Sequence, residues 1–139
     1  MRVCVKTSLY LALSVAAFGQ QKTTPGSTPS TRIEHGKYIA ENVAMCVQCH
    51  SPREATGELV RSKLFEGAPI PVDKPSQLSV WADYAPRIAG LPQYTEDQMV
   101  KLLTTGIGRE GKPLRAPMPT FKMTLQDAAD VVTYLKLIK

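Results

Sequence analysis

The sequence predicts an all-α domain, and three observations support this fold class. Three segments place apolar residues at helical spacing, and each begins at a threonine that can cap a helix. The stretch between the first two segments, residues 51–94, is rich in proline and glycine, which interrupt regular structure. We therefore expect three main helices to form the core, joined by long Pro/Gly-rich loops.

The first predicted helix begins at Thr31, where Glu34 completes a capping box, and it continues into Cys46 and Cys49. Gly36 lies on the same helical pattern as its apolar positions. The apolar positions of this helix are Ile33, Ile39, Ala40 and Val43.

The second predicted helix begins at Thr95, with Gln98 at the capping-box position, and it ends at Gly106. Its apolar stripe consists of Met99, Leu102 and Leu103. The third begins at Thr124, with Asp127 at the box position. Its apolar positions are Ala128, Val131, Val132, Leu135 and Ile138.

The segment from 51 to 94 is unusually long for a loop in a compact domain. A short strand or hairpin is expected over residues 59–65. The three apolar stripes are also modest for a domain of this size. Both observations favour a core that is completed by a large apolar cofactor.

Residues 1–19 have the features of a signal peptide. Arg2 and Lys6 form a basic start, residues 7–17 are apolar, and residues 17–19 offer a small-x-small cleavage site. The apolar run is shorter than the roughly 20 residues that a membrane-spanning helix needs. We expect export and cleavage; the alternatives are an uncleaved membrane anchor and a buried N-terminal helix.

The predicted domain boundaries follow from this interpretation. Residues 1–19 are the signal peptide, residues 20–31 form a flexible leader rich in Pro, Ser and Thr, and residues 32–139 form one domain. Loss of Arg2 and Lys6 from the 17 basic residues leaves 15 against 12 acidic ones. This mildly basic, scattered charge does not indicate a nucleic-acid-binding protein.

Residues 46–50, Cys-Val-Gln-Cys-His, match the C-x-x-C-H motif for haem attachment. Two thiols three positions apart can reach the two vinyl groups of one porphyrin, and the adjacent His50 can then bind the iron. A thioredoxin-like redox site would need a βαβ pattern around the cysteines, which is absent from the sequence. A zinc site would need further Cys or His ligands, and the only other histidine is His35. The motif therefore predicts one covalent haem c bonded to Cys46 and Cys49.

The second axial ligand of such a haem is expected to be a methionine thioether. We favour Met118, because Pro117 and Pro119 exclude helix and are expected to present its side chain from a rigid, extended segment. Met123 is the next candidate, and a histidine or an open site is the remaining alternative. Met45 is too close to the attachment site, and Met99 belongs to a helical core stripe. His35, between Glu34 and Gly36, is expected to be a surface residue.

These motifs, in this order and spacing, resemble the class I cytochromes c, specifically the small bacterial monohaem c-type cytochrome domains. The similarity covers residues 32–139. It rests on Gly-Lys-Tyr-Ile-Ala before the haem motif, residues 85–90 (Ala-Pro-Arg-Ile-Ala-Gly), residues 103–106 (Leu-x-x-Gly), Gly111, Met118-Pro119-x-Phe121, and a last helix that ends in Val-Val-Thr-Tyr-Leu-Lys.

The resemblance implies the cytochrome c fold, with three main helices around one covalent haem. It implies that the carbonyl of Pro86 accepts a hydrogen bond from His50 and that Met118 is the axial methionine. It also implies that the last helix, which contains Tyr134, crosses the first helix near Gly36. The segment 51–85 is longer than in the shortest members of the family, and Trp81 is expected to pack at the haem edge.

The expected function is that of a periplasmic one-electron carrier with His/Met-ligated haem iron, an electron-transport protein and not itself an enzyme. Its partners would be redox proteins, with no nucleic acid and no membrane after signal cleavage, and the chain would act as a monomer or as a subunit of a complex. Lys37, Lys112 and Lys122 either steer an acidic partner or form an ordinary solvated surface. The alternatives are a haem-bearing electron-transfer subunit of a periplasmic dehydrogenase, and a haem enzyme or gas sensor with an open sixth site.

Overall fold

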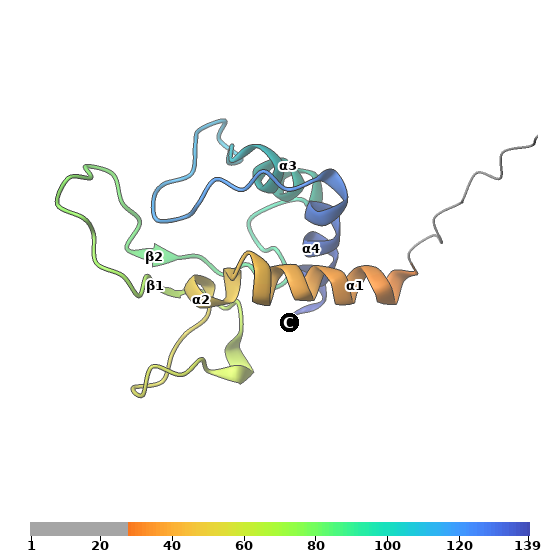
Figure 1. Ribbon diagram of the computed structural model, residues 1–139, viewed down its shortest axis with the longest axis horizontal. Coiled ribbons are helices and arrows are strands. Elements are labelled where there is room, and N and C mark those ends of the chain that lie inside the picture. Colours follow the sequence, from red (N-terminus) through yellow and green to blue (C-terminus); the bar gives the residue numbers. More distant parts are fainter. Residues whose placement is uncertain (1–27) are drawn as a thin grey trace, which may run out of the picture.

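A computed structural model of the protein describes residues 28–139, so the predicted signal peptide and most of the predicted leader lie outside the described residues. Within this range the regular structure is mainly helical, with four α-helices and one small two-stranded sheet. The all-α prediction is therefore confirmed at the level of a mostly helical domain (Figure 1). No helix within residues 28–139 is long and apolar enough to cross a membrane.

Helix α1 spans Pro29–Tyr38 and begins earlier than predicted. The capping residue is Thr28, whose side chain accepts a hydrogen bond from the backbone N–H of Thr31. Pro29 occupies the first turn, where its missing N–H and fixed φ suit a helix start. The expected cap at Thr31 is thus wrong, and the helix begins inside the segment predicted to be a flexible leader.

The first predicted helix is also not continuous. After α1 the chain forms a π-helical turn over Ile39–Val43, in which the N–H of Ala44 donates to the carbonyl of Ile39 over 2.8 Å. Met45 then adopts a left-handed conformation with φ 51°, and the short helix α2, Cys46–His50, starts in a new direction. π-Helical turns are rare in proteins, and those that occur are often found at functional sites. This one directly precedes the C-x-x-C-H motif.

The other two helical predictions are confirmed. Helix α3 spans Glu96–Thr105, with a complete Thr95–Gln98 capping box and a left-handed Gly106 at its end. Helix α4 spans Leu125–Leu137 and is capped by Thr124, whose hydroxyl accepts from the N–H of Asp127.

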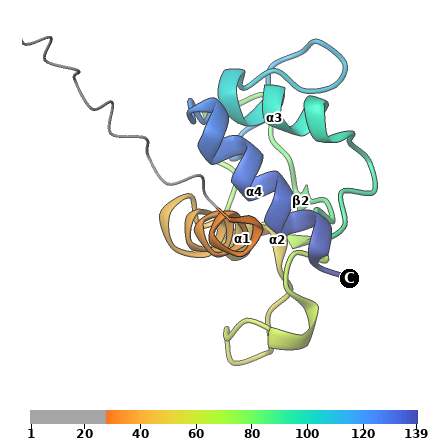
Figure 2. The ribbon, with the colours of Figure 1, turned by 90° about the vertical axis from the view of Figure 1, so that its right-hand side faces the viewer.

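The core lies where α1, α3 and α4 meet. Helix α4 crosses α1 and also packs against α3 (Figure 2). At the α1–α4 crossing a Cβ atom on Gly36 would lie 2.0 Å from the carbonyl oxygen of Asp130, so only glycine permits this approach. The predicted crossing at Gly36 is confirmed. An ion pair between Glu96 and Lys136 further joins α3 to α4.

The long segment after α2 contains little regular structure. Strand β1 (Ala68–Pro69) pairs antiparallel with β2 (Tyr84–Ala85), with Ala68 opposite Ala85. The strand or hairpin expected over residues 59–65 is wrong, because a 3₁₀ turn, Arg61–Lys63, occupies that position. All three residues of the turn are exposed and polar, so they lack the alternation of apolar side chains that a half-buried strand requires.

Candidate functional site

An apolar cavity lies between α2, α3, α4 and the loop before α4. Its empty volume is about 1130 Å³, including the part that opens to solvent. Helices α3 and α4 contribute several of their buried residues to the wall. The large apolar lining residues are Ile70, Ile88, Met99, Leu102, Leu103, Leu114, Phe121, Val131 and Leu135. Such a cavity suits a flat or bulky apolar group.

The three chemically active residues of the C-x-x-C-H motif all line this cavity. They lie on one face of α2 because positions i, i+3 and i+4 of a helix are neighbours. Cys46 and Cys49 are both free cysteines. Helix α2 therefore presents two thiols and one imidazole to a common apolar space.

The imidazole of His50 is held by the backbone. Its Nδ1–H donates to the carbonyl oxygen of Pro86 over 2.7 Å, which is the hydrogen bond that the resemblance implied. This bond leaves Nε2 as the nitrogen with a free lone pair. Only 6% of His50 is exposed, and burial lowers the pKa of the ring, opposed in part by the bond to Pro86. The ring is therefore neutral, is oriented by the Pro86 carbonyl, and presents Nε2 as a possible ligand atom.

The environment of Cys46 disfavours its thiolate. Burial raises the pKa of the Cys46 thiol to about 11. Dithiol–disulfide exchange uses the opposite arrangement, in which the attacking thiol has a lowered pKa and is accessible. The structure therefore gives no support to a thioredoxin-like role for this pair.

Met118 lines the same cavity from a different direction. It belongs to the loop between α3 and α4, whose ribbon lies apart from α2 (Figure 1). The expected extended segment is instead a turn, closed by a hydrogen bond of 3.2 Å from the N–H of Met118 to the carbonyl of Arg115. The Ala116–Pro117 peptide is cis, which is typical of a tight turn. Pro117 and Pro119 also line the cavity.

The other methionines differ in their positions. Met45 and Met99 line the cavity, Met45 beside the cysteines and Met99 from the buried face of α3. Met123 packs against the core without lining the cavity, and its N–H donates to the carbonyl of Leu103. Among the described residues, Met118 is thus the methionine that the loop between α3 and α4 contributes to the cavity.

Several lining residues were not identified from the sequence. Tyr84, Tyr94 and Arg115 come from loops and from the edge of the small sheet, where no periodic pattern marks them. Trp81, which was expected at this site, is half-buried but does not line the cavity. Its neighbour Ala82, on the same loop between β1 and β2, contributes to the wall.

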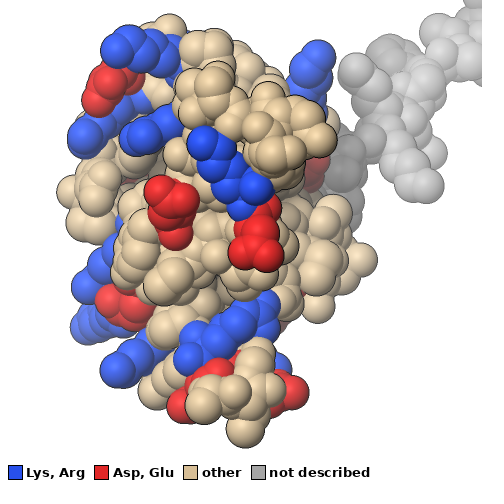
Figure 3. Space-filling view, turned by 90° about the vertical axis from the view of Figure 1, so that its left-hand side faces the viewer, with Lys and Arg blue, Asp and Glu red and all other residues tan. Residues whose placement is uncertain are grey.

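The surface charges are mixed. On the face towards which the loop between β1 and β2 projects, Lys and Arg side chains lie along the edges and also near the middle, with acidic side chains among them (Figure 3). This agrees with the scattered pattern of charge in the sequence. No single sign of charge covers the part of this face that the structure describes.

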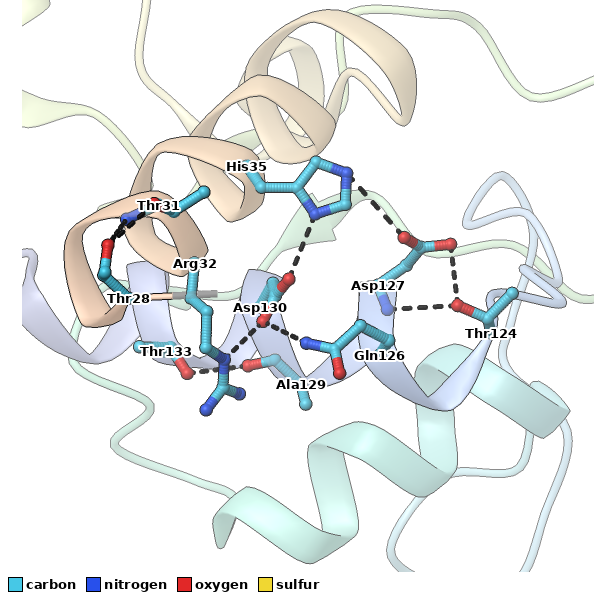
Figure 4. A network of polar contacts seen from close by, with 10 residues as sticks. All are labelled: Thr28, Thr31, Arg32, His35, Thr124, Gln126, Asp127, Ala129, Asp130 and Thr133. Carbon is cyan, nitrogen blue, oxygen red and sulfur yellow. Dashed lines mark hydrogen bonds and ion pairs between the residues drawn. The ribbon is translucent and has the colours of Figure 1, made fainter. Parts of the chain in front are cut away.

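His35 does not line the cavity; its side chain points from α1 towards Asp127 and Asp130 of α4 (Figure 4). Its side chain is 45% exposed, so the surface prediction is confirmed. Its Nδ1–H nevertheless donates to Asp130 over 3.0 Å. Arg32 and Gln126 also donate to this carboxylate, over 2.7 and 2.8 Å. His35 is therefore part of a helix-to-helix network and not a ligand at the cavity.

No protein-family model and no curated protein matches the chain. Within residues 28–139 no group of three His, Cys, Asp or Glu side chains could hold a bare metal ion. Any functional assignment therefore depends on the motif at 46–50 and on the cavity that it lines.

Proposed function

We propose that this domain binds one haem c, bonded covalently to Cys46 and Cys49, with His50 and Met118 as its axial ligands. The observation that supports the proposal is that both thiols, the imidazole and the thioether line one apolar cavity. These are the side chains that c-type attachment and His/Met ligation require.

The chemistry of these residues fits that group. Thioether formation consumes neutral thiols, and the buried Cys46 thiol is protonated. The imidazole offers Nε2 because Nδ1–H is engaged with Pro86. The thioether of Met118 is a soft ligand, and the surrounding walls are largely apolar. On this basis we also propose the cytochrome c fold for residues 32–139.

We infer that the protein is a one-electron carrier. The bound haem would supply a reversible one-electron change at its iron. The residues of the chain would position and shield this group: the Pro86 carbonyl orients His50, and the apolar walls from α3 and α4 exclude water. With both axial positions taken by His50 and Met118, no position remains for a substrate. We further propose that the N-terminal segment directs export to the periplasm, where c-type attachment takes place.

A second candidate is an electron-transfer subunit of a larger periplasmic oxidoreductase. Two residues at the cavity, Met45 and Tyr84, are 50% and 57% exposed. Exposed apolar side chains beside a redox centre favour contact with a partner protein. The mixed charge of Figure 3 fits a small, transient contact with a donor or acceptor protein.

The test of haem attachment is expression in a host that matures c-type cytochromes. Full-length protein should retain haem after denaturation, as an increase in mass and as peroxidase stain on a denaturing gel. The double variant Cys46→Ala/Cys49→Ala should lose both signals, because neither thiol of the motif remains to bond the vinyl groups. Cys4→Ser is the matched control and should keep them. Wild-type protein without covalent haem would refute the proposal.

A further inference from the structure

The segment that follows the haem motif has no role in the function proposed so far. Within it, residues 65–67 form a tight, largely buried turn. Phe65 is fully buried and adopts a positive φ of 62°, and its ring packs edge-on against Tyr134 at 6.0 Å between centroids. A left-handed Phe is uncommon, so the surrounding contacts must favour it.

One side of this turn is bonded to the haem motif. The N–H of Gly67 donates to the carbonyl of His50 over 2.8 Å. The N–H of Phe65 donates to the hydroxyl of Ser51 over 2.9 Å, and Ser51 is only 1% exposed. The turn therefore fixes the backbone at His50 and at the next residue.

The other side of the turn is bonded to the segment around Pro86. The carbonyl of Phe65 accepts hydrogen bonds from the N–H groups of Ile88 and Ala89, over 2.9 and 3.1 Å. The partly exposed side chain of Glu66, the middle residue of the turn, also pairs with Arg87 at 3.2 Å.

Gly67 also allows the turn to touch this segment directly. A Cβ atom on Gly67 would lie 2.7 Å from the backbone nitrogen of Arg87 and 2.9 Å from the carbonyl oxygen of Ala85. Its φ of +86° is a further reason for glycine at this position. Ala85 in turn pairs with Ala68 in the small sheet. The backbone on both sides of Pro86 thus rests on residues 65–68.

From this arrangement we infer that residues 65–67 act as a positioning turn that sets the hydrogen bond between His50 Nδ1 and the Pro86 carbonyl. The inference rests on the proposed haem ligation by His50. Donor and acceptor are 36 positions apart in the sequence, and the turn is bonded to the backbone beside each of them. The strength of this hydrogen bond sets how strongly the imidazole donates electrons to iron. The turn therefore tunes the reduction potential without touching the haem cavity.

The direction of the effect follows from the chemistry. A strong bond from Nδ1–H to the carbonyl makes the ring more basic, and a more basic ligand stabilises the ferric state. Loosening the turn should lengthen this bond and shift the reduction potential upwards. If the turn only stabilised the fold, loosening it would lower the melting temperature without changing the reduction potential.

The test compares Ser51→Ala and Gly67→Ala with Val132→Ala in the haem-loaded full chain. Ser51→Ala removes one hydrogen bond of the turn and is the milder change. Val132 is buried in α4 and does not line the cavity, so its truncation destabilises the fold at a distance. The measurements are the reduction potential, the near-infrared band of methionine-ligated ferric haem, and amide hydrogen exchange at Gly67.

We expect both turn variants to have a higher potential than wild type, with the methionine band retained. We expect Gly67 exchange in Ser51→Ala to be roughly fivefold faster, as loss of one hydrogen bond predicts. Val132→Ala should melt at a lower temperature with an unchanged potential. If Ser51→Ala and wild type have the same reduction potential, the inference is overturned, even where Gly67→Ala does not fold. A potential shift in Val132→Ala as large as that in Ser51→Ala would overturn it as well. Wild-type protein without haem would instead refute the proposed function.

Discussion

The backbone of Gly36 in α1 lies directly against the backbone of Asp130 in α4, with no side chain between them. The residue after Asp130, Val131, lines the cavity, as does Leu135 one turn later. The contact between Gly36 and Asp130 therefore sets the depth at which α4 forms the cavity wall. It links a structural glycine outside the site to the shape of the site.

Gly36→Ala should be strongly destabilising. Its Cβ would lie 2.0 Å from the carbonyl oxygen of Asp130, so α1 and α4 would have to separate. We expect a loss of about 2–4 kcal/mol in the free energy of unfolding, measured by denaturant titration. Gly108→Ala is the matched control, because its nearest contact would be an ordinary 3.5 Å. Equal stability of the two variants would contradict the close crossing.

Asp130 should make stability depend on pH in acid. Burial alone would raise the pKa of its carboxyl, but hydrogen bonds from Arg32, His35 and Gln126 outweigh burial and lower the pKa below its usual 3.8. A lowered folded pKa means that this stabilisation is fully present above pH 3.8 and is lost as the pH falls through the folded value.

Asp130→Asn should therefore cost about 1–3 kcal/mol at pH 7 and flatten the loss of stability in acid. The measurement is the midpoint of urea unfolding between neutral and acid pH. Asp73→Asn, at an exposed position in the long loop, should behave like wild type. An acid profile that is identical in wild type and Asp130→Asn would show that the network contributes nothing.

Tyr134→Phe tests a second contact between α4 and the chain before the haem motif. The hydroxyl of Tyr134 donates to Glu41 in the π-helical turn over 2.5 Å, and the variant should lose about 1 kcal/mol at neutral pH. Burial and the Glu41 carboxylate raise the pKa of Tyr134 above its usual 10.0. Stability from this group should therefore be lost as the pH rises past 10.0, where the unfolded state releases its proton first.

The variant should consequently show a shallower alkaline decline, measured by thermal unfolding between pH 8 and 11. The ring contact with Phe65 is kept in Tyr134→Phe, so the difference reports the hydroxyl alone. Tyr38→Phe is the control, because the Tyr38 side chain is largely exposed. A control that loses as much stability as Tyr134→Phe would argue against the bond to Glu41.

On the proposed His/Met ligation, Met118→Ala should remove the near-infrared charge-transfer band of the purified ferric protein, because it deletes the thioether ligand. Met123→Ala should keep the band, since Met123 packs against the core without lining the cavity. The ferrous variant Met118→Ala should then bind carbon monoxide rapidly, through its open position. Rapid binding by ferrous wild type would instead favour the gas sensor or haem enzyme.

Helices with strong local signals were predictable from the sequence. The capping box at Thr95, the left-handed Gly106 and the cap at Thr124 all occur as expected, because each signal acts within one turn of its own helix. The cavity residues on α3 and α4 were likewise expected as apolar stripes. At the site, the motif itself indicated Cys46, Cys49 and His50.

Features that depend on distant contacts were not predictable. The sheet joins residues 68 and 85, and its strands are only two residues long, too short for any alternation. The break between α1 and α2 requires the π-helical turn and the left-handed Met45, and no proline or glycine marks it. The turn at Met118 is closed by a hydrogen bond to the carbonyl of Arg115, and the two prolines beside Met118 do not indicate this bond.

The crossing of α1 and α4 also has a consequence for the order of folding. A ribosome makes α1 first and α4 last, and Gly36 meets Asp130 across 94 positions of chain. Contacts of such high sequence separation form slowly. Whether the chain emerges by synthesis or by export, α1 therefore lacks its main packing partner until α4, near the end of the domain, has emerged as well.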